Sequence, residues 1–129
     1  MAEENKKTVM IVDDEDETRR LLEFALKNAG YQVREANSGQ KALELLGEFV
    51  PDAIVLDIVM PDMDGYTLVK KIKEIPDLTK IPVVISSGKG GMKDLFELEA
   101  EMYRPDAFLV KPYKMKELIG TVDRILKNA

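Results

Sequence analysis

The stretch Ala53–Asp57 constrains the fold of this chain more than any other. It places four consecutive apolar residues, two of them β-branched, before an aspartate. A short apolar run of this kind is typical of a strand that is buried on both faces. A turn-forming segment over residues 61–65 follows at once, so we expect the strand to end at Asp57. Open α/β sheets bind ligands beyond the carboxyl ends of their strands, which makes Asp57 a candidate site residue as well as a common turn former.

Four other segments are predicted strands. Three of them are apolar runs that end in polar residues, namely Thr8–Val12 before Asp13-Asp14, Ile81–Ile85 before Ser86-Ser87, and Ala107–Val110 before Lys111-Pro112. The fourth, residues 31–36, alternates between apolar and polar residues. Alternation is typical of a strand nearer the edge of a sheet.

Segments with helical spacing of apolar residues separate these strands. They lie at about 18–29, 38–49, 64–72, 92–102 and 115–126. Asp14 or Asp16 is a candidate N-cap for the first, Ser38 for the second and Asp64 for the third, and Gly30 stands where a left-handed C-terminal residue belongs. Five strands that alternate with five helices predict an α/β fold. We expect a doubly wound, five-stranded parallel sheet of flavodoxin-like type with helices on both faces.

Composition fits one globular domain and excludes several chemistries. The chain has 129 residues, which suits a single domain over residues 8–129 after a polar, frayed N-terminus over residues 1–7. A net charge of -5 disfavours nucleic acid and anionic membranes as direct partners. The lack of Cys excludes zinc–thiolate sites, and the lack of His means that any imidazole must come from a partner. The polar N-terminus is not a signal peptide and no apolar run reaches the roughly 20 residues of a membrane span, so we expect a cytoplasmic protein.

Five polar residues stand at or just beyond the ends of predicted strands: Asp13, Asp14, Asp57, Ser87 and Lys111. In the strand order 2-1-3-4-5 they converge on one crevice. Clustered carboxylates repel one another unless a cation lies among them, and hard oxygen ligands with room for water suit Mg²⁺. A carboxylate beside such an ion can attack phosphorus, and phosphoryl oxygens need cationic and hydroxyl partners. Ser86 is the alternative to Ser87 as that hydroxyl, because the sequence leaves the end of the strand open.

Several motifs follow one another in the chain with characteristic gaps. They are Val12-Asp13-Asp14, Leu56-Asp57-Ile58-Val59-Met60-Pro61, Asp64-Gly65, Ile81-Pro82-Val83 with Ser87, and Lys111-Pro112. Together they resemble the response-regulator receiver domain of two-component signalling, of the stand-alone type related to the chemotaxis regulators. The resemblance runs from about Thr8 to the C-terminus.

The resemblance implies a role for each matching residue. Asp57 would accept a phosphoryl group from a phosphohistidine on a sensor histidine kinase or a histidine phosphotransfer protein. Asp14 would bind Mg²⁺ directly, Asp13 mainly through water, and the backbone carbonyl of Val59 would be a further protein ligand. Lys111 would contact the phosphoryl group.

The same resemblance implies a switch and an output surface. Ser87 would be the switch hydroxyl. Phe108 is expected to pack in its strand and also to change its arrangement together with Ser87. The Lys111–Pro112 bond is expected to be cis. Helix four, strand five and helix five would bind a downstream protein or a second copy of the chain. Such a module catalyses only its own phosphorylation and dephosphorylation and is not an enzyme in the usual sense.

Two other functions are open to a chain of this fold. A phosphatase with an aspartyl nucleophile places a second acid two residues after the nucleophile, whereas that position here is Val59. A pseudo-receiver that binds partners without phosphate would not need the acids and Lys111. The resemblance also places Val59 and Lys89 beside the path of the hydrolytic water, where an apolar and a long cationic side chain favour a long-lived phosphorylated state.

Overall fold

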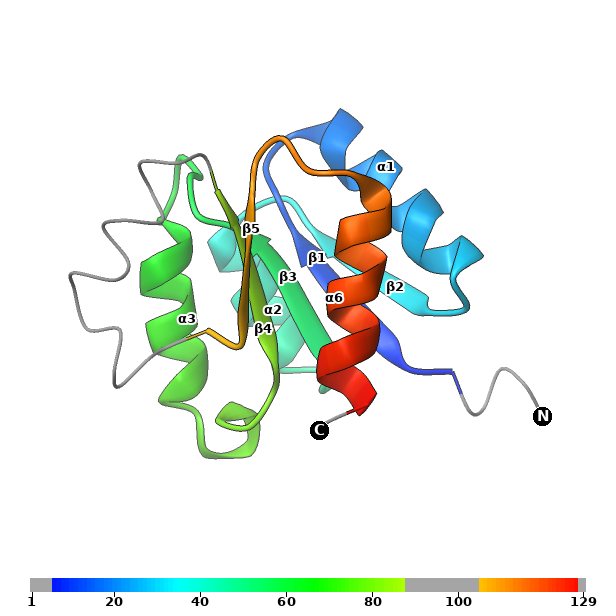
Figure 1. Cartoon of the computed structure of the whole chain (residues 1–129). Coiled ribbons are helices and arrows are strands. Elements are labelled where there is room, and N and C mark those ends of the chain that lie inside the picture. Colours follow the sequence, from blue (N-terminus) through cyan, green and yellow to red (C-terminus); the bar gives the residue numbers. More distant parts are fainter. Residues whose placement is uncertain (1–5, 88–104, 128–129) are drawn as a thin grey trace.

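The computed structural model describes residues 6–87 and 105–127, and Figure 1 shows the whole chain. The strands are β1 (Thr8–Val12), β2 (Gln32–Ala36), β3 (Ala53–Asp57), β4 (Val83–Ser87) and β5 (Ala107–Val110). The helices are α1 (Asp16–Asn28), α2 (Gly39–Leu46), α3 (Gly65–Lys73), the short 3-10 helix η1 (Pro76–Leu78) and α6 (Met115–Lys127). The predicted helix over residues 92–102 lies outside the described residues.

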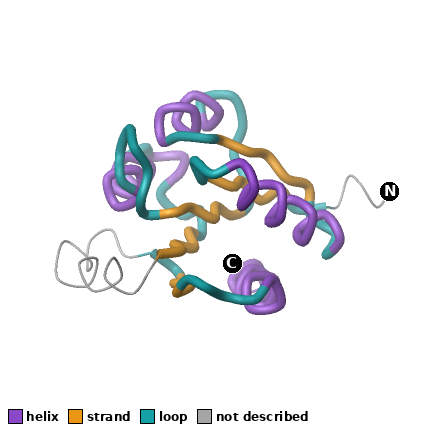
Figure 2. The backbone as a smooth tube through the Cα atoms, turned by 90° about the horizontal axis from the view of Figure 1, so that it is seen from above, coloured by secondary structure: helices purple, strands orange, loops and turns teal. Residues whose placement is uncertain are grey.

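The five strands form one parallel sheet in the order β2-β1-β3-β4-β5, which confirms the predicted fold. Seen from above, the strands form a single layer with helices on both sides (Figure 2). β3 lies in the middle of the sheet, and all five of its residues are buried. The sheet therefore carries Asp57, the last residue of β3, to the centre of its carboxyl edge.

Each face of the sheet has its own apolar core, because successive side chains along a strand point to opposite faces. On one face Ile54 and Leu56 of β3 pack with residues of α2 and α3. On the other face Ala53 and Val55 pack with residues of α1 and α6. A central parallel strand buried on both sides has to be apolar throughout, which explains the sequence of β3.

Most of the predicted helix ends are confirmed. Ser38 caps α2 by accepting a hydrogen bond from the Lys41 amide at 3.1 Å, and Asp64 caps α3 through the Thr67 amide at 2.7 Å. Gly30 follows α1 with φ of +100°, in the left-handed region that glycine tolerates.

Three boundaries differ from the sequence predictions. The N-cap of α1 is Glu15, without a side-chain cap, and neither Asp14 nor Asp16 fills that place. The second helix ends at Leu46 and does not reach Phe49, because Gly47 follows; the Phe49 ring instead lies 4.5 Å from the Arg34 guanidinium. β4 begins later and extends to the serines that were expected to follow it, since the backbones of β3 and β5 pair with them.

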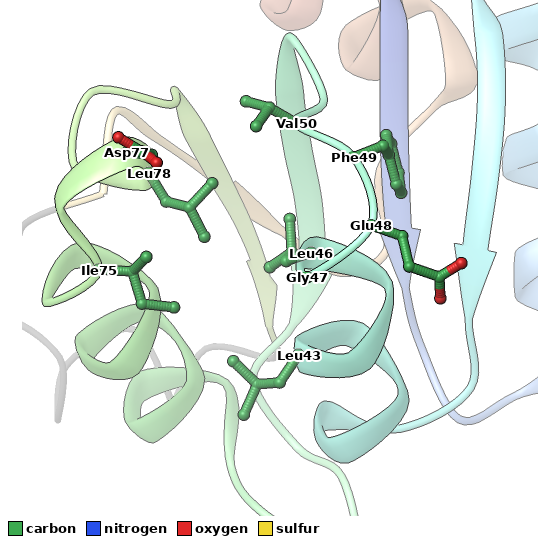
Figure 3. A pocket seen from close by; sticks show the side chains of 9 residues that line it. All are labelled: Leu43, Leu46, Gly47, Glu48, Phe49, Val50, Ile75, Asp77 and Leu78. Atoms are coloured by element: carbon green, nitrogen blue, oxygen red, sulfur yellow. The ribbon is translucent and has the colours of Figure 1, made fainter.

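A groove of about 410 Å³ lies at the end of the sheet that is opposite to Asp57. Figure 3 shows Leu43 and Leu46 of α2 facing Ile75 and Leu78 across it, with Val50 at one side. Val50 precedes β3, and Ile75 and Leu78 precede β4, so the groove lies at the amino ends of the strands.

In the described part of the chain, no helix has the length and apolar character needed to cross a membrane.

Candidate functional site

The carboxyl ends of β1, β3 and β5 bring Asp13, Asp57 and Lys111 together. Asp57 is 8% exposed and lies between β1 and β4 in the sheet. The Lys111 ammonium is 3.3 Å from Oδ2 of Asp57 and 3.8 Å from Oδ2 of Asp13. The Lys111 ammonium therefore lies close to both of these largely buried carboxylates. The convergence predicted for these three residues is confirmed by this geometry.

Asp13 is the most deeply buried acid of the site, with 2% of its surface exposed. Its Oδ1 accepts a hydrogen bond from the Glu15 amide at 2.9 Å, and its carbonyl oxygen accepts one from Nη1 of Arg19 at 2.8 Å. Burial is the main cause that raises the pKa of Asp13, and the negative charges of Asp57 and Asp14 raise it further. The Glu15 amide and Lys111 act in the opposite direction, but the net shift is upward.

Asp13, Asp14 and Asp57 together form a candidate metal site. One carboxylate oxygen from each residue lies within 4.8 Å of the others. Asp14 is exposed, whereas the other two are buried. Three hard oxygen donors beside open solvent suit a divalent cation that keeps part of its water shell. A bound cation would also offset the charge repulsion that raises the pKa of Asp13.

The loop after β3 is fastened to α2, which sequence reasoning did not predict. The Asp62 carboxylate accepts hydrogen bonds from the amides of Gly39 and Gln40, at 3.2 and 2.9 Å. Both bonds lower the pKa of Asp62, and the bond from the Gln40 amide has the larger effect. Val59, in the same loop, is 71% exposed, and its amide lies 3.4 Å from Oδ1 of Asp57. Asp62 thereby anchors the segment that follows Asp57.

Two serines end β4, and they differ in surroundings. Ser86 pairs with Asp57 in the sheet and is 2% exposed. Burial raises the pKa of Tyr113 above its ordinary value, and the Ser86 side chain acts in the opposite direction. Ser87 is the last residue of the strand and pairs with Val110, and its side chain lies outside the described part. Sequence reasoning did not single out Tyr113, although its place directly after Lys111-Pro112 was a signal.

The remaining predicted site residues are placed as follows. Phe108 lies in β5, half-buried, and packs against the core on the α2 and α3 side of the sheet. The Lys111–Pro112 peptide bond is cis, as predicted. Lys89 lies outside the described residues.

Fold and site together define a class: doubly wound α/β proteins that carry an acidic cluster and a lysine at the carboxyl edge of a central strand. The sequence model of the response regulator receiver domain matches residues 9–123, and the chain belongs to this family. Receiver domains are signalling domains, and the acidic cluster and Lys111 lie within the matched segment.

Individual relatives agree with the assignment. A probable transcriptional regulator, ycf27 of Guillardia theta, is 36% identical over 128 residues, which cover 97% of this chain and 47% of that protein. The transcriptional regulatory protein SrrA of Staphylococcus aureus is 33% identical over 120 residues, with 93% and 48% covered. The chain thus spans about half the length of the curated relatives it matches.

Solved structures show the same fold. A putative response regulator from Chloroflexus aurantiacus has a TM-score of 0.87 at 33% identity, with 95% of this chain and 99% of that chain covered. The chemotaxis response regulator CheY4 of Vibrio cholerae has a TM-score of 0.86 at 26% identity, with 94% and 99% covered.

Proposed function

We propose that residues 8–129 form a receiver module that accepts a phosphoryl group on Asp57 from a phosphohistidine of a partner protein. The observation that carries the proposal is the position of Asp57, largely buried beside Asp13, with the Lys111 ammonium 3.3 Å away. A largely buried carboxylate beside a cation stands at a place where a phosphoryl group can be received, because the cation can contact the phosphoryl oxygens. The chain has no His, so the donor imidazole has to come from the partner.

The chemical step transfers the phosphoryl group from an imidazole nitrogen of the partner to a carboxylate oxygen of Asp57. A carboxylate oxygen of Asp57 forms a bond to phosphorus while the P–N bond of the phosphohistidine breaks, and its electron pair stays on the imidazole nitrogen. Lys111 lies on the side of Asp57 Oδ2 and can hold one of the equatorial phosphoryl oxygens. The module thereby acts on itself, both in gaining the phosphoryl group and in losing it to water.

The acidic cluster fits Mg²⁺ as the cofactor of this transfer. Asp14 would bind the ion directly, Asp13 mainly through water, and Asp57 and the Val59 carbonyl would complete the protein ligands. The carboxylate oxygens that lie within 4.8 Å of one another support this assignment, as does the preference of Mg²⁺ for oxygen ligands and retained water. When bound, the ion neutralises charge that develops on the phosphoryl oxygens.

The proposed output is a population shift at β5 and its neighbours. A phosphoryl group on Asp57 would draw in the Ser87 hydroxyl and bias Phe108 toward one packing arrangement. Phe108 lies in β5, the strand at the edge of the sheet, so a change in its packing would reach the surface around that strand. That surface would bind a downstream protein or a second copy of the chain, and a sensor histidine kinase or a phosphotransfer protein would supply the phosphoryl group.

The test of the function is labelling by acetyl phosphate with and without Mg²⁺, followed by intact-mass measurement. We expect one added phosphoryl group in the parent and none in Asp57→Asn, because the amide is a poor nucleophile. Removal of Mg²⁺ should abolish labelling as well. Labelling of Asp57→Asn at the parental level would show that the phosphoacceptor is another residue.

We expect the phosphorylated state to be long-lived. Val59 is exposed beside Asp57 and has no group that could hydrogen-bond and orient an attacking water. Exchange of Val59 for Asn should therefore speed loss of the phosphoryl group several-fold. Lys89→Glu should do the same if the lysine covers the phosphoryl group, and the double variant should be fastest. The measurement is decay of the phosphorylated protein at fixed Mg²⁺, and equal or slower decay in all three variants would refute the prediction.

A further inference from the structure

Asp13 and Asp14 are consecutive residues at the point where the chain leaves the sheet. β1 ends at Val12, and the Asp13 amide still donates a hydrogen bond to the Ala36 carbonyl of β2 at 3.1 Å. Asp14 is exposed and lies in the turn before α1. A peptide group turns as one rigid plane, so its rotation between the two aspartates would swing one carboxylate relative to the other. The shape of the candidate metal site therefore depends on what holds this peptide group.

Arg19 holds the peptide group between the two aspartates. Its Nη1 donates a 2.8 Å hydrogen bond to the carbonyl oxygen of Asp13, which belongs to the peptide bond that joins Asp13 to Asp14. Arg19 lies near the start of α1, which begins at Asp16. The bond thus ties the first turn of the helix back to the metal-site turn and limits the rotation of the peptide group.

Two carboxylates orient the Arg19 guanidinium in turn. Its Nε lies 3.3 Å from Oε1 of Glu35 on β2, and its Nη2 is paired with Oδ1 of Asp16. The Arg19 side chain is only 14% exposed, which is typical of an arginine that is paired. A guanidinium is a rigid planar fork, so three nitrogens with three partners fix it in one orientation. A lysine ammonium has no such fork.

The charge of Arg19 and its geometry predict opposite effects on Mg²⁺. A cation near the acidic cluster repels a second cation, so loss of the charge alone would strengthen Mg²⁺ binding. Loss of the hydrogen bond to the Asp13 carbonyl would leave the two candidate ligands less well oriented and would weaken Mg²⁺ binding. Asp16 and Glu35 offset the charge of the guanidinium, so we expect the geometric effect to prevail.

We propose that Arg19 is a positioning residue of the metal site, which sets the orientation of Asp13 relative to Asp14 through the peptide group between them. Glu35 acts one step further out, because it orients the guanidinium. The inference rests on the proposed function, in which these acids hold Mg²⁺. Arg19 need not touch the ion or the phosphoryl group.

The test is the Mg²⁺ affinity of Arg19→Lys and Arg19→Met, measured from amide chemical shifts as Mg²⁺ is added without any phosphodonor. Arg19→Lys keeps the charge and loses the fork, so a weaker affinity reports on geometry. We expect its dissociation constant to rise roughly three- to tenfold, the size expected for one hydrogen bond. Arg19→Met should weaken binding at least as much, although it removes a positive charge. The shifts report on the folded protein, and urea unfolding shows that each variant is folded.

Arg20→Lys and Arg20→Met are the matched controls, because Arg20 is the next residue of α1 and is exposed. Arg20→Lys should bind Mg²⁺ like the parent, and Arg20→Met should bind it as tightly or slightly more tightly. Amide exchange of the metal-free proteins gives a second readout. Exchange at Asp14 and Glu15 should be faster in the Arg19 variants and unchanged in the Arg20 variants.

The possible outcomes separate the two proposals. A parent that binds Mg²⁺, with parental or tighter binding in both Arg19 variants, would overturn the positioning role and leave the proposed function intact. Equal weakening in the Arg20 variants would also overturn that role, because the loss would not depend on the Arg19 contacts. A parent whose amide shifts over residues 13–15 do not respond to Mg²⁺ would overturn the metal assignment of the proposed function, and the role of Arg19 with it.

Discussion

Gly65→Ala is expected to destabilise the domain and to suppress phosphorylation in the same step. A β-carbon at this position would stand 2.6 Å from the carbonyl oxygen of Asp57 and 2.6 Å from Cα of Ile58. Both atoms belong to the backbone and cannot rotate away, and the Gly65 amide donates a 2.7 Å hydrogen bond to the Ile58 carbonyl. Overpacking of this kind lowers the free energy of unfolding by about 1–3 kcal/mol. The forced shift of Asp57 and Ile58 should also misplace the carboxylate that receives the phosphoryl group.

The measurement pairs urea unfolding with acetyl-phosphate labelling under conditions where the variant is still folded. Gly120→Ala is the control, since it makes the same exchange inside α6, where the added β-carbon would meet no described atom within 4 Å apart from its own helical turn. That variant should gain about 0.5–1 kcal/mol, because alanine is a better helix former than glycine, and should label like the parent. A Gly65→Ala variant as stable and as active as the parent would show that the β3–α3 loop tolerates displacement.

Asp13→Asn is expected to stabilise the metal-free protein and to weaken its response to Mg²⁺. Asp13 is buried, and burial with the neighbouring carboxylates raises its pKa above the ordinary value. Asparagine has nearly the same shape and can still accept the Glu15 amide hydrogen bond, but it carries no charge. Replacement by a neutral group should raise the free energy of unfolding at pH 7, because the raised pKa of Asp13 means that its ionised form is disfavoured in the folded state.

The pH dependence has a definite sign. A carboxyl group whose pKa is raised in the folded state favours folding while it is protonated, and this contribution is lost as the pH rises through the folded-state pKa. The advantage of Asp13→Asn over the parent should therefore be full at neutral pH and vanish as the pH falls below the ordinary pKa of 3.8. An advantage that does not change with pH would contradict this cause.

Added Mg²⁺ should reduce the stability advantage of Asp13→Asn over the parent. An ion that binds only the folded state stabilises it according to its concentration and affinity, so the parent should gain stability on titration with Mg²⁺ and Asp13→Asn should gain less. Asp14→Ala should lose more Mg²⁺ affinity than Asp13→Ala, because Asp14 is the proposed direct ligand. Equal stabilisation of the parent and of all these variants by Mg²⁺ would place the metal site elsewhere.

The sequence by itself determined the fold and the chemical character of the site. β3 is apolar at every position before Asp57 because a central parallel strand is buried on both faces, and that pattern is visible in one dimension. The alternation of strands and helices predicts a parallel sheet, and in the order β2-β1-β3-β4-β5, one of the two common doubly wound orders, Asp13, Asp57 and Lys111 come to one edge. Each of these inferences uses a periodicity or a neighbour in the chain.

Only the tertiary structure decided which polar side chains meet. Asp62 binds amides of α2 that lie 22 and 23 residues away. The need for glycine at position 65 likewise depends on the close approach of the Asp57 carbonyl. Hydrogen bonds and close contacts between distant segments depend on distances of a few ångströms after packing, and no periodicity of the sequence encodes them.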